Sequence, residues 1–250
     1  TRDRPVTAGW LIGLGAAAGT WPALLLVAFG VVALRERRAA DLLPAAMAAT
    51  GVWLLANAPA FLSGRSEWER YWSVATERGP ETGTVWTIVD GAVGISQGTA
   101  ATVSWTLLGA WMAAVVALCL LAHKPPRVTQ VAFLLLAGVV LLRLSFEPQH
   151  ALWLLPLAAL ARPRWQDLLV WQAGEVLHLV MMAWWSGGLL DPAGDGPDAF
   201  YWLAVAAHVA GTLWLVSAVM RDVWVADLDP VAQARGVDQV TTTRSNVVAV

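Results

Sequence analysis

The chain has 250 residues, of which 58% are hydrophobic and only 14% are charged, and its formal net charge is −2. Soluble domains usually carry about 25% charged residues, so the composition excludes an ordinary soluble domain and indicates a membrane protein. The single cysteine, Cys119, excludes a disulfide framework and any cysteine-based metal site. The net charge says little about partners; we expect a lipid bilayer and no nucleic acid.

Several runs of about 20 mostly apolar residues recur, which is the length an α-helix needs to cross a bilayer. They predict an all-α, polytopic transmembrane bundle of about seven or eight membrane helices, some short or broken. In the first stretch, residues 7–34, Gly19-Thr20-Trp21-Pro22 breaks the pattern. Because proline interrupts a helix, this stretch is either one kinked span or a short hairpin. Later spans are predicted at residues 41–61, 99–122, 128–146, 150–161, 166–186 and 200–220.

The Arg and Lys residues between spans set the expected orientation. If each later span crosses once, these residues fall on one side, which the positive-inside rule makes cytoplasmic. Loops 62–98 and 187–199 would then face outward, in a multi-pass protein of the plasma membrane. Residues 1–225 would form the membrane domain and residues 226–250 a flexible cytoplasmic tail. The basic residues are Arg35, Arg37, Arg38, Lys124, Arg127, Arg162, Arg164 and Arg221.

Tryptophan is abundant, with 16 residues, and several lie near the ends of apolar runs, among them Trp10 and Trp86. Amphipathic rings favour the membrane–water interface, so we expect these side chains there. The remaining tryptophans are expected to pack between helices.

The segment WERYWSVATERGPETGTVW, residues 68–86, mixes aromatic and charged side chains within the long predicted loop. Arg70 and Arg78 suit a clamp for a phosphate at the outer surface, because guanidinium groups bind phosphate oxygens in a bidentate way. Tyr71 and Arg78 are one heptad apart and would share a helix face. The alternative is an interfacial amphipathic helix with solvated ion pairs.

Four polar side chains interrupt the apolar segment LRLSFEPQHALWLLPLAAL, residues 142–160. Arg143 and Glu147 are four apart, so on a helix they share a face and are predicted to pair. Pro148 then ends the outgoing helix, and Gln149 and His150 begin a short return helix whose first N–H groups lack intrahelical partners. In one interpretation Gln149 and His150 contact a substrate; in the other they cap the turn and meet interfacial water.

Glu175 and His178 lie three residues apart on a predicted span, so they share a face near the middle of the membrane. Glu-x-x-His is half of the carboxylate-bridged di-iron motif, but that site needs a second pair and two further Glu on other helices. The sequence does not supply them, so we predict no metal site. We expect Glu175 to pair with a neighbour inside the bundle and keep it as a functional candidate, since intramembrane carboxylates are costly. His208 is expected to make a helix–helix contact.

In series, four segments resemble actinobacterial glycosyltransferase family 87, of the GT-C superfamily of multi-spanning transferases. They are the glycine-rich hairpin with its proline and Arg cluster, the aromatic–Arg–Gly segment ending in Gly-Thr-Val-Trp, the Pro-Gln-His element with Trp153 and Pro156, and VWQAGE. Two positions depart from the family pattern. Gly19-Thr20 stands where the hairpin normally carries a Lys, and His150 replaces a Tyr.

The resemblance implies a membrane-embedded hexosyltransferase without a cofactor. It would move a hexose, often mannose in this family, from a polyprenyl-phosphate sugar to a lipid or glycan acceptor on the extracytoplasmic face. The superfamily's catalytic carboxylate lies in the first extracytoplasmic loop, which the resemblance places before Thr1. The catalytic residue is therefore unknown here, and we expect these 250 residues alone to be inactive. Donor contacts would come from Arg70, Tyr71, Arg78, Gln149 and His150.

Two other functions fit the same residues. Broken helices and the intramembrane Glu175 suit a multi-pass transporter or flippase of lipid-linked substrates equally well. Transporters often contain paired repeats, and the sequence shows no repeat of fixed period. A non-catalytic membrane scaffold is the third interpretation.

Overall fold

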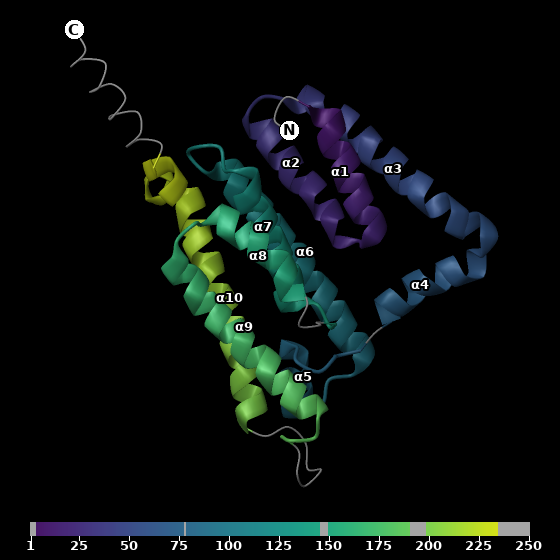
Figure 1. Cartoon of the computed structure of the whole chain (residues 1–250), viewed down its shortest axis with the longest axis vertical. Coiled ribbons are helices and arrows are strands. Elements are labelled where there is room, and N and C mark those ends of the chain that lie inside the picture. The colour runs from purple at the N-terminus through teal and green to yellow at the C-terminus, as the bar shows by residue number, and fades with distance from the viewer. Residues whose placement is uncertain (1–3, 78, 146–149, 191–198, 235–250) are drawn as a thin grey trace. The chain divides into compact units, whose positions relative to one another are not determined.

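The structure is a computed structural model that describes residues 4–77, 79–145, 150–190 and 199–234. All regular structure in these ranges is helical (Figure 1). Among the described residues, four helical segments are long and apolar enough to cross a bilayer: Ala39–Ser63, Gln97–Leu121, Trp165–Ser186 and Ala199–Trp224. Four shorter apolar helices accompany them: Pro5–Ala18, Trp21–Arg35, Val128–Leu142 and Ala151–Ala161. The predicted all-α bundle of membrane type is confirmed.

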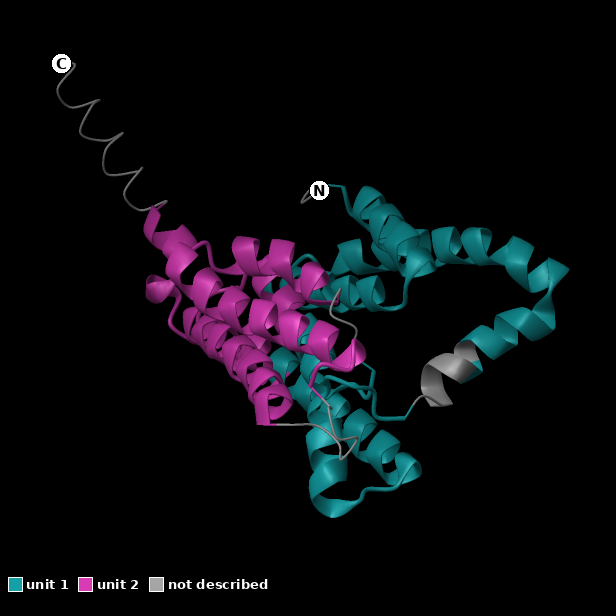
Figure 2. Ribbon diagram, turned by 60° about the horizontal axis from the view of Figure 1, so that its bottom comes forward, with its two compact units in different colours: residues 1–116, 135–147 teal, residues 117–134, 148–250 magenta. Residues whose placement is uncertain are grey.

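The chain forms two compact units (Figure 2). Unit 1 comprises Thr1–Val116 and Leu135–Glu147, and unit 2 comprises Ala117–Leu134 and Pro148–Val250. The boundaries fall within α6 (Gln97–Leu121) and α7 (Val128–Leu142), so each of these helices contributes residues to both units.

In unit 1, helix α1 (Pro5–Ala18) packs on α3 (Leu42–Ser63) through small residues. A Cβ atom added to Gly9 would lie 2.1 Å from the carbonyl oxygen of Ala45, and one added to Gly13 would lie 2.5 Å from that of Ala49. The two backbones are therefore in direct contact. Small residues spaced four apart allow this close packing between membrane helices.

The same contacts show that the first apolar stretch is a hairpin. Because Gly9 faces Ala45 and Gly13 faces Ala49, α1 and α3 run in the same direction. Helix α2 (Leu24–Arg35), which links them after the 3₁₀ turn η1 (Trp21–Ala23), must return in the opposite direction. Of the two predicted alternatives, the short hairpin is the one observed. Pro22 lies in the first turn of η1, where its missing N–H costs little.

The segment predicted as a long outer loop, residues 62–98, contains two helices. These are α4 (Arg65–Glu77), which is rich in charged residues, and α5 (Val85–Val93). An exposed ion pair joins Arg65 to Glu69 at 2.8 Å on α4. The segment therefore contains helical structure, while the phosphate clamp, its alternative of solvated ion pairs at the interface, and the outward orientation all stay predictions.

Helix α7 is buried along residues 130–141 and ends at Leu142, four residues before the predicted end of the span. The carbonyl oxygen of Leu142 accepts hydrogen bonds from Trp86 Nε1 at 2.8 Å and from Ser104 Oγ at 2.6 Å. These donors satisfy a carbonyl that the helix itself leaves unpaired. Only 4% of Trp86 is exposed and it belongs to the core, and its expected position at the membrane interface stays a prediction.

In unit 2, helices α8 (Ala151–Ala161), α9 (Trp165–Ser186) and α10 (Ala199–Trp224) are joined at one end by a network of charges. Arg127, before α7, donates to the carbonyl oxygens of Leu160 and Ala161 at 2.6 Å each, and to both carboxylate oxygens of Asp229. The start of α7 and the end of α8 therefore lie together.

Arg162 extends this network. Its side chain donates to Asp167 at 2.7 Å and to Asp222 near the end of α10. The basic residues Lys124, Arg127 and Arg162 thus lie together at one end of unit 2. This agrees with the prediction that they lie on one side of the membrane. That this end is cytoplasmic stays a prediction.

The predicted flexible tail begins with ordered structure. Residues 226–228 form a 3₁₀ turn and residues 230–234 are helical. Asp229 caps this helix by accepting a hydrogen bond from the backbone N–H of Val231 at 3.1 Å. Lys124 binds Asp227 at 2.8 Å. Residues 226–234 are therefore fixed to the loop before α7, and the rest of the predicted tail lies outside the described residues.

Candidate functional site

The buried polar site of unit 2 forms where α9 and α10 approach most closely. A Cβ atom added to Gly174 would lie 2.6 Å from the carbonyl oxygen of Ala207. One added to Gly211 would lie 3.4 Å from the carbonyl oxygen of Trp171. Two glycines, one from each helix, thus allow the backbones to come together, and side chains next to this crossing are held within hydrogen-bonding reach.

Glu175 follows Gly174 and is the acceptor at the centre of the site. Its carboxylate receives the indole N–H of Trp171 at 2.8 Å and the hydroxyl of Thr212 at 3.2 Å. Both oxygens lie 2.9 Å from His208 Nδ1. Only 7% of Glu175 is exposed. Its hydrogen bonds to these partners replace the bonds to water that the carboxylate loses on burial.

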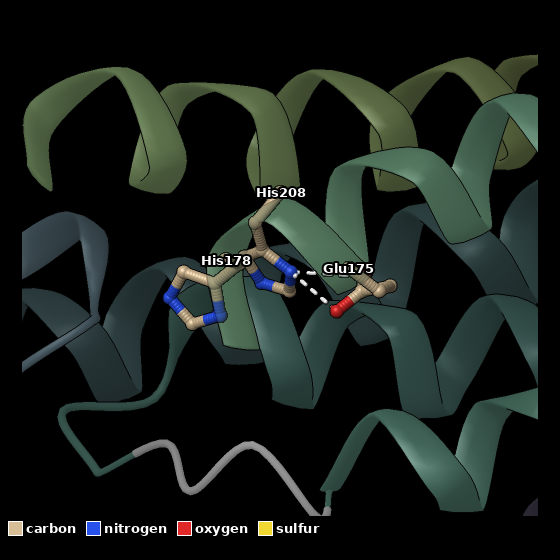
Figure 3. A group of neighbouring side chains, drawn as sticks. All are labelled: Glu175, His178 and His208. Carbon is tan, nitrogen blue, oxygen red and sulfur yellow. Dashed lines mark hydrogen bonds and ion pairs between the residues drawn. The ribbon is translucent and has the colours of Figure 1, made fainter. Parts of the chain in front are cut away.

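His178 and His208 complete the cluster (Figure 3). His178 lies one turn after Glu175 on α9 and His208 comes from α10, and 1% and 3% of these residues are exposed. Their rings are stacked, with centroids 4.8 Å apart and planes inclined by 26°. Each of Glu175, His178 and His208 offers one potential ligand atom, and these three atoms lie within 4.8 Å of one another.

The arrangement can perform three kinds of chemistry. A carboxylate that accepts the Nδ1–H of an imidazole fixes the tautomer and orientation of the ring, which leaves Nε2 as an acceptor. The pair can also carry a proton, and two imidazoles with a carboxylate can bind a transition metal. Intramembrane ionisable groups commonly serve such roles.

No family model, curated protein or solved structure matches the chain. The resemblance to glycosyltransferase family 87 therefore depends on the four sequence segments alone.

The structure places the predicted donor-binding residues outside the buried cluster. Arg70 and Tyr71 are exposed on α4 of unit 1. His150 is half-buried at the start of α8 in unit 2, where its ring centroid lies 4.3 Å from that of Trp153. Arg78 and Gln149 lie outside the described residues.

Arg143 has partners other than the predicted one. Its guanidinium lies 4.7 Å from the ring centroid of Trp21 and 5.1 Å from that of Trp105, and it donates to Ser145 at 3.3 Å. Arg143 directly follows the end of α7 at Leu142, and its predicted pairing with Glu147 stays a prediction. Glu147 itself lies outside the described residues.

Sequence reasoning linked Glu175 to His178 and kept His208 apart. The first two share a helix face, which the spacing reveals. The distance from Glu175 to His208 depends on how α9 and α10 pack, and no periodicity reports it. The available indications were Gly174 and Gly211, which permit a close crossing, together with polar residues on two otherwise apolar spans.

Proposed function

We propose that the protein is a membrane-embedded hexosyltransferase of the family 87 type. Its donor would be a polyprenyl-phosphate sugar, with mannose as the hexose, and its acceptor a lipid or glycan on the extracytoplasmic face. The proposal combines the four sequence segments with one structural observation, the shortness of α8. The bilayer environment that it requires agrees with the four long apolar helices.

Helix α8 has 11 residues, which corresponds to a length of about 16 Å. The hydrocarbon core of a bilayer is about 30 Å thick. The last two residues of α8 accept hydrogen bonds from Arg127 in the charged network. If that network lies at the membrane surface, α8 begins at about half the depth of the hydrocarbon core.

A helix that begins at this depth has unpaired N–H groups in its first turn. Such groups need protein partners or a water-filled cavity, because lipid chains provide neither. A polar cavity at this depth would suit a transferase, because a sugar carried on a lipid must enter from the membrane. The positive end of the helix dipole at His150 also favours a phosphate. His150, with Gln149 before it, is the proposed donor contact, and Arg70 and Tyr71 stay predicted ones.

A donor-binding experiment tests the proposal. The chain is reconstituted in lipid nanodiscs and photolabelled with a photoreactive, radioactive polyprenyl-phosphomannose. Wild type and the control His123→Ala, which changes an exposed histidine of unit 2, should be labelled equally. His150→Ala should bind about 10- to 100-fold more weakly, since a hydrogen bond to a charged group contributes about 1.5–3 kcal/mol. No labelling of the wild type, or equal labelling of His150→Ala, contradicts the proposal.

A transporter or flippase is the second candidate, and the buried pair of Glu175 and His208 favours it, since such pairs mark substrate and proton pathways. Sealed liposomes containing the protein distinguish the two functions. A transferase binds the labelled donor but leaves it in its leaflet, and because these 250 residues alone are expected to be inactive, no polyprenyl phosphate should be released. A flippase moves the intact labelled lipid between leaflets, with or without an acceptor.

A further inference from the structure

The buried cluster of α9 and α10 has the composition of a metal site. It offers one carboxylate oxygen and two imidazole nitrogens within 4.8 Å of one another, and its three residues are each at least nine-tenths buried. We propose that Glu175, His178 and His208 bind a divalent transition-metal ion, with Zn²⁺ the ion that fits best. This site is independent of the transferase proposal.

The hydrogen bonds of Glu175 indicate which oxygen would bind the ion. Of the described bonds, Oε1 accepts from Trp171, Thr212 and His208, whereas Oε2 accepts from His208 alone. Oε2 therefore keeps a lone pair that can bind an ion. Trp171 and Thr212 hold the other oxygen, as partners outside the ligand shell commonly do in metal sites, where they orient the ligand.

His208 already lies close enough to that oxygen for both to bind the same ion. Its Nδ1 lies 2.9 Å from Oε2, and zinc binds nitrogen at about 2.0–2.1 Å and carboxylate oxygen at about 2.0–2.2 Å. One ion can therefore touch both atoms by replacing the hydrogen of the bond between them. A neutral His208 keeps its proton by moving it to Nε2, whereas a protonated His208 releases one proton to solvent.

His178 must turn to complete the site. Stacked rings inclined by only 26° do not direct lone pairs at one point. Rotation of a histidine ring about χ2 meets a broad, shallow torsional potential, and it can bring a nitrogen of His178 toward the ion without moving α9. The backbones stay fixed, because Gly174 is in contact with Ala207 and leaves no room for the helices to shift inward.

The ligand set selects among metals. Imidazole nitrogens favour zinc and neighbouring transition metals, whereas Mg²⁺ and Ca²⁺ prefer oxygen ligands only. Three protein ligands leave a fourth coordination position for water or another molecule, as in zinc sites that keep one position open. With one ligand from α10 and two from α9, the ion would also fasten the two helices together.

Cobalt titration tests the site, because Co²⁺ absorbs visible light and adopts the same geometry as zinc. The purified protein, treated with a chelator and dialysed, should bind one equivalent of Co²⁺ with the absorption of a four-coordinate complex. Zn²⁺ should displace it and Mg²⁺ should not. Glu175→Gln, His178→Ala and His208→Ala should each weaken binding more than about 100-fold, beyond the loss expected for an outer-shell partner. The control His123→Ala should bind as the wild type does.

Two further measurements guard against a variant that does not fold. Thr212→Val keeps the side-chain shape, removes the hydroxyl that holds Oε1, and should weaken Co²⁺ binding about tenfold. Zn²⁺ should raise the unfolding temperature of wild type and His123→Ala, because an ion that binds only the folded state stabilises it. A wild type that binds neither Co²⁺ nor Zn²⁺, or an unchanged affinity in Thr212→Val and Glu175→Gln, overturns the proposal.

Discussion

The indole N–H of Trp86 donates a 2.8 Å hydrogen bond to the backbone carbonyl of Leu142, the last residue of α7. Ser104 donates to the same oxygen at 2.6 Å. A helix that ends within an apolar protein leaves carbonyls that lipid cannot satisfy. Trp86 on α5 and Ser104 on α6 therefore fix where α7 ends, and they do so from positions distant in sequence.

Trp86→Phe should destabilise unit 1 modestly. The phenyl ring still fills the core, but the carbonyl of Leu142 loses one of two donors, which costs about 1 kcal/mol while Ser104 remains. The double variant Trp86→Phe/Ser104→Ala should lose more than the sum of the single changes, because the carbonyl then has neither donor. Unfolding free energies in detergent micelles measure both. Trp10→Phe, at an exposed site, is the control and should be unchanged.

Gly13→Ala should separate α1 from α3. The added Cβ would lie 2.5 Å from the carbonyl oxygen of Ala49, and since that neighbour is backbone, the helices must move apart and lose packing. We expect a loss of about 1–3 kcal/mol, the usual cost of overpacking. Gly51→Ala is the matched control on α3, because nothing lies within 4 Å of its Cβ position. It should be neutral or stabilising by about 0.5–1 kcal/mol. Equal effects of the two changes would contradict the proposed packing.

The long spans could be predicted from sequence because they depend on local hydrophobicity alone. The span predicted at 166–186 is observed as Trp165–Ser186, and the one predicted at 99–122 as Gln97–Leu121. The end of α7 was predicted too late, since its position depends on Trp86 and Ser104 rather than on the apolar run around it.

In the candidate site, too, one relation could be predicted from the sequence and the other could not. The relation of Glu175 to His178 follows from helical geometry. The contact with His208 depends on the crossing of α9 and α10, which in turn depends on Gly174 and Gly211. Packing between helices is set by three-dimensional contacts, and a single sequence shows only that small residues permit it.

Asp227 provides a test by pH. It lies outside the spans, and its hydrogen bond with Lys124, together with the charge of that ammonium group, lowers the pKa of the Asp227 carboxyl below its usual 3.8. A depressed folded-state pKa means that the pair contributes above pH 3.8 and is lost as the pH falls through the lower folded-state value. The carboxyl carbon shift in an NMR titration should show a midpoint below 3.8. In Lys124→Ala the midpoint should return toward the usual value; an identical midpoint in both proteins would show that the pair does not form in solution.

Arg162→Ala should be among the most damaging changes in unit 2. Arg162 and Asp222 are each 1% exposed, and the guanidinium also binds Asp167. Removing Arg162 leaves a buried carboxylate without its counter-charge, which costs about 3–5 kcal/mol. Arg65→Ala breaks the pair with Glu69, whose side chains are 71% and 54% exposed, and should cost less than about 1 kcal/mol. Unfolding free energies of the two variants in the same detergent give the comparison. The double change Arg162→Met with Asp222→Leu should recover much of the loss, because it removes the buried carboxylate of Asp222. Asp167 still loses its partner, but its side chain is 15% exposed and can meet water. If Arg162→Ala proves no more destabilising than Arg65→Ala, the charged network does not hold the ends of α8, α9 and α10 together.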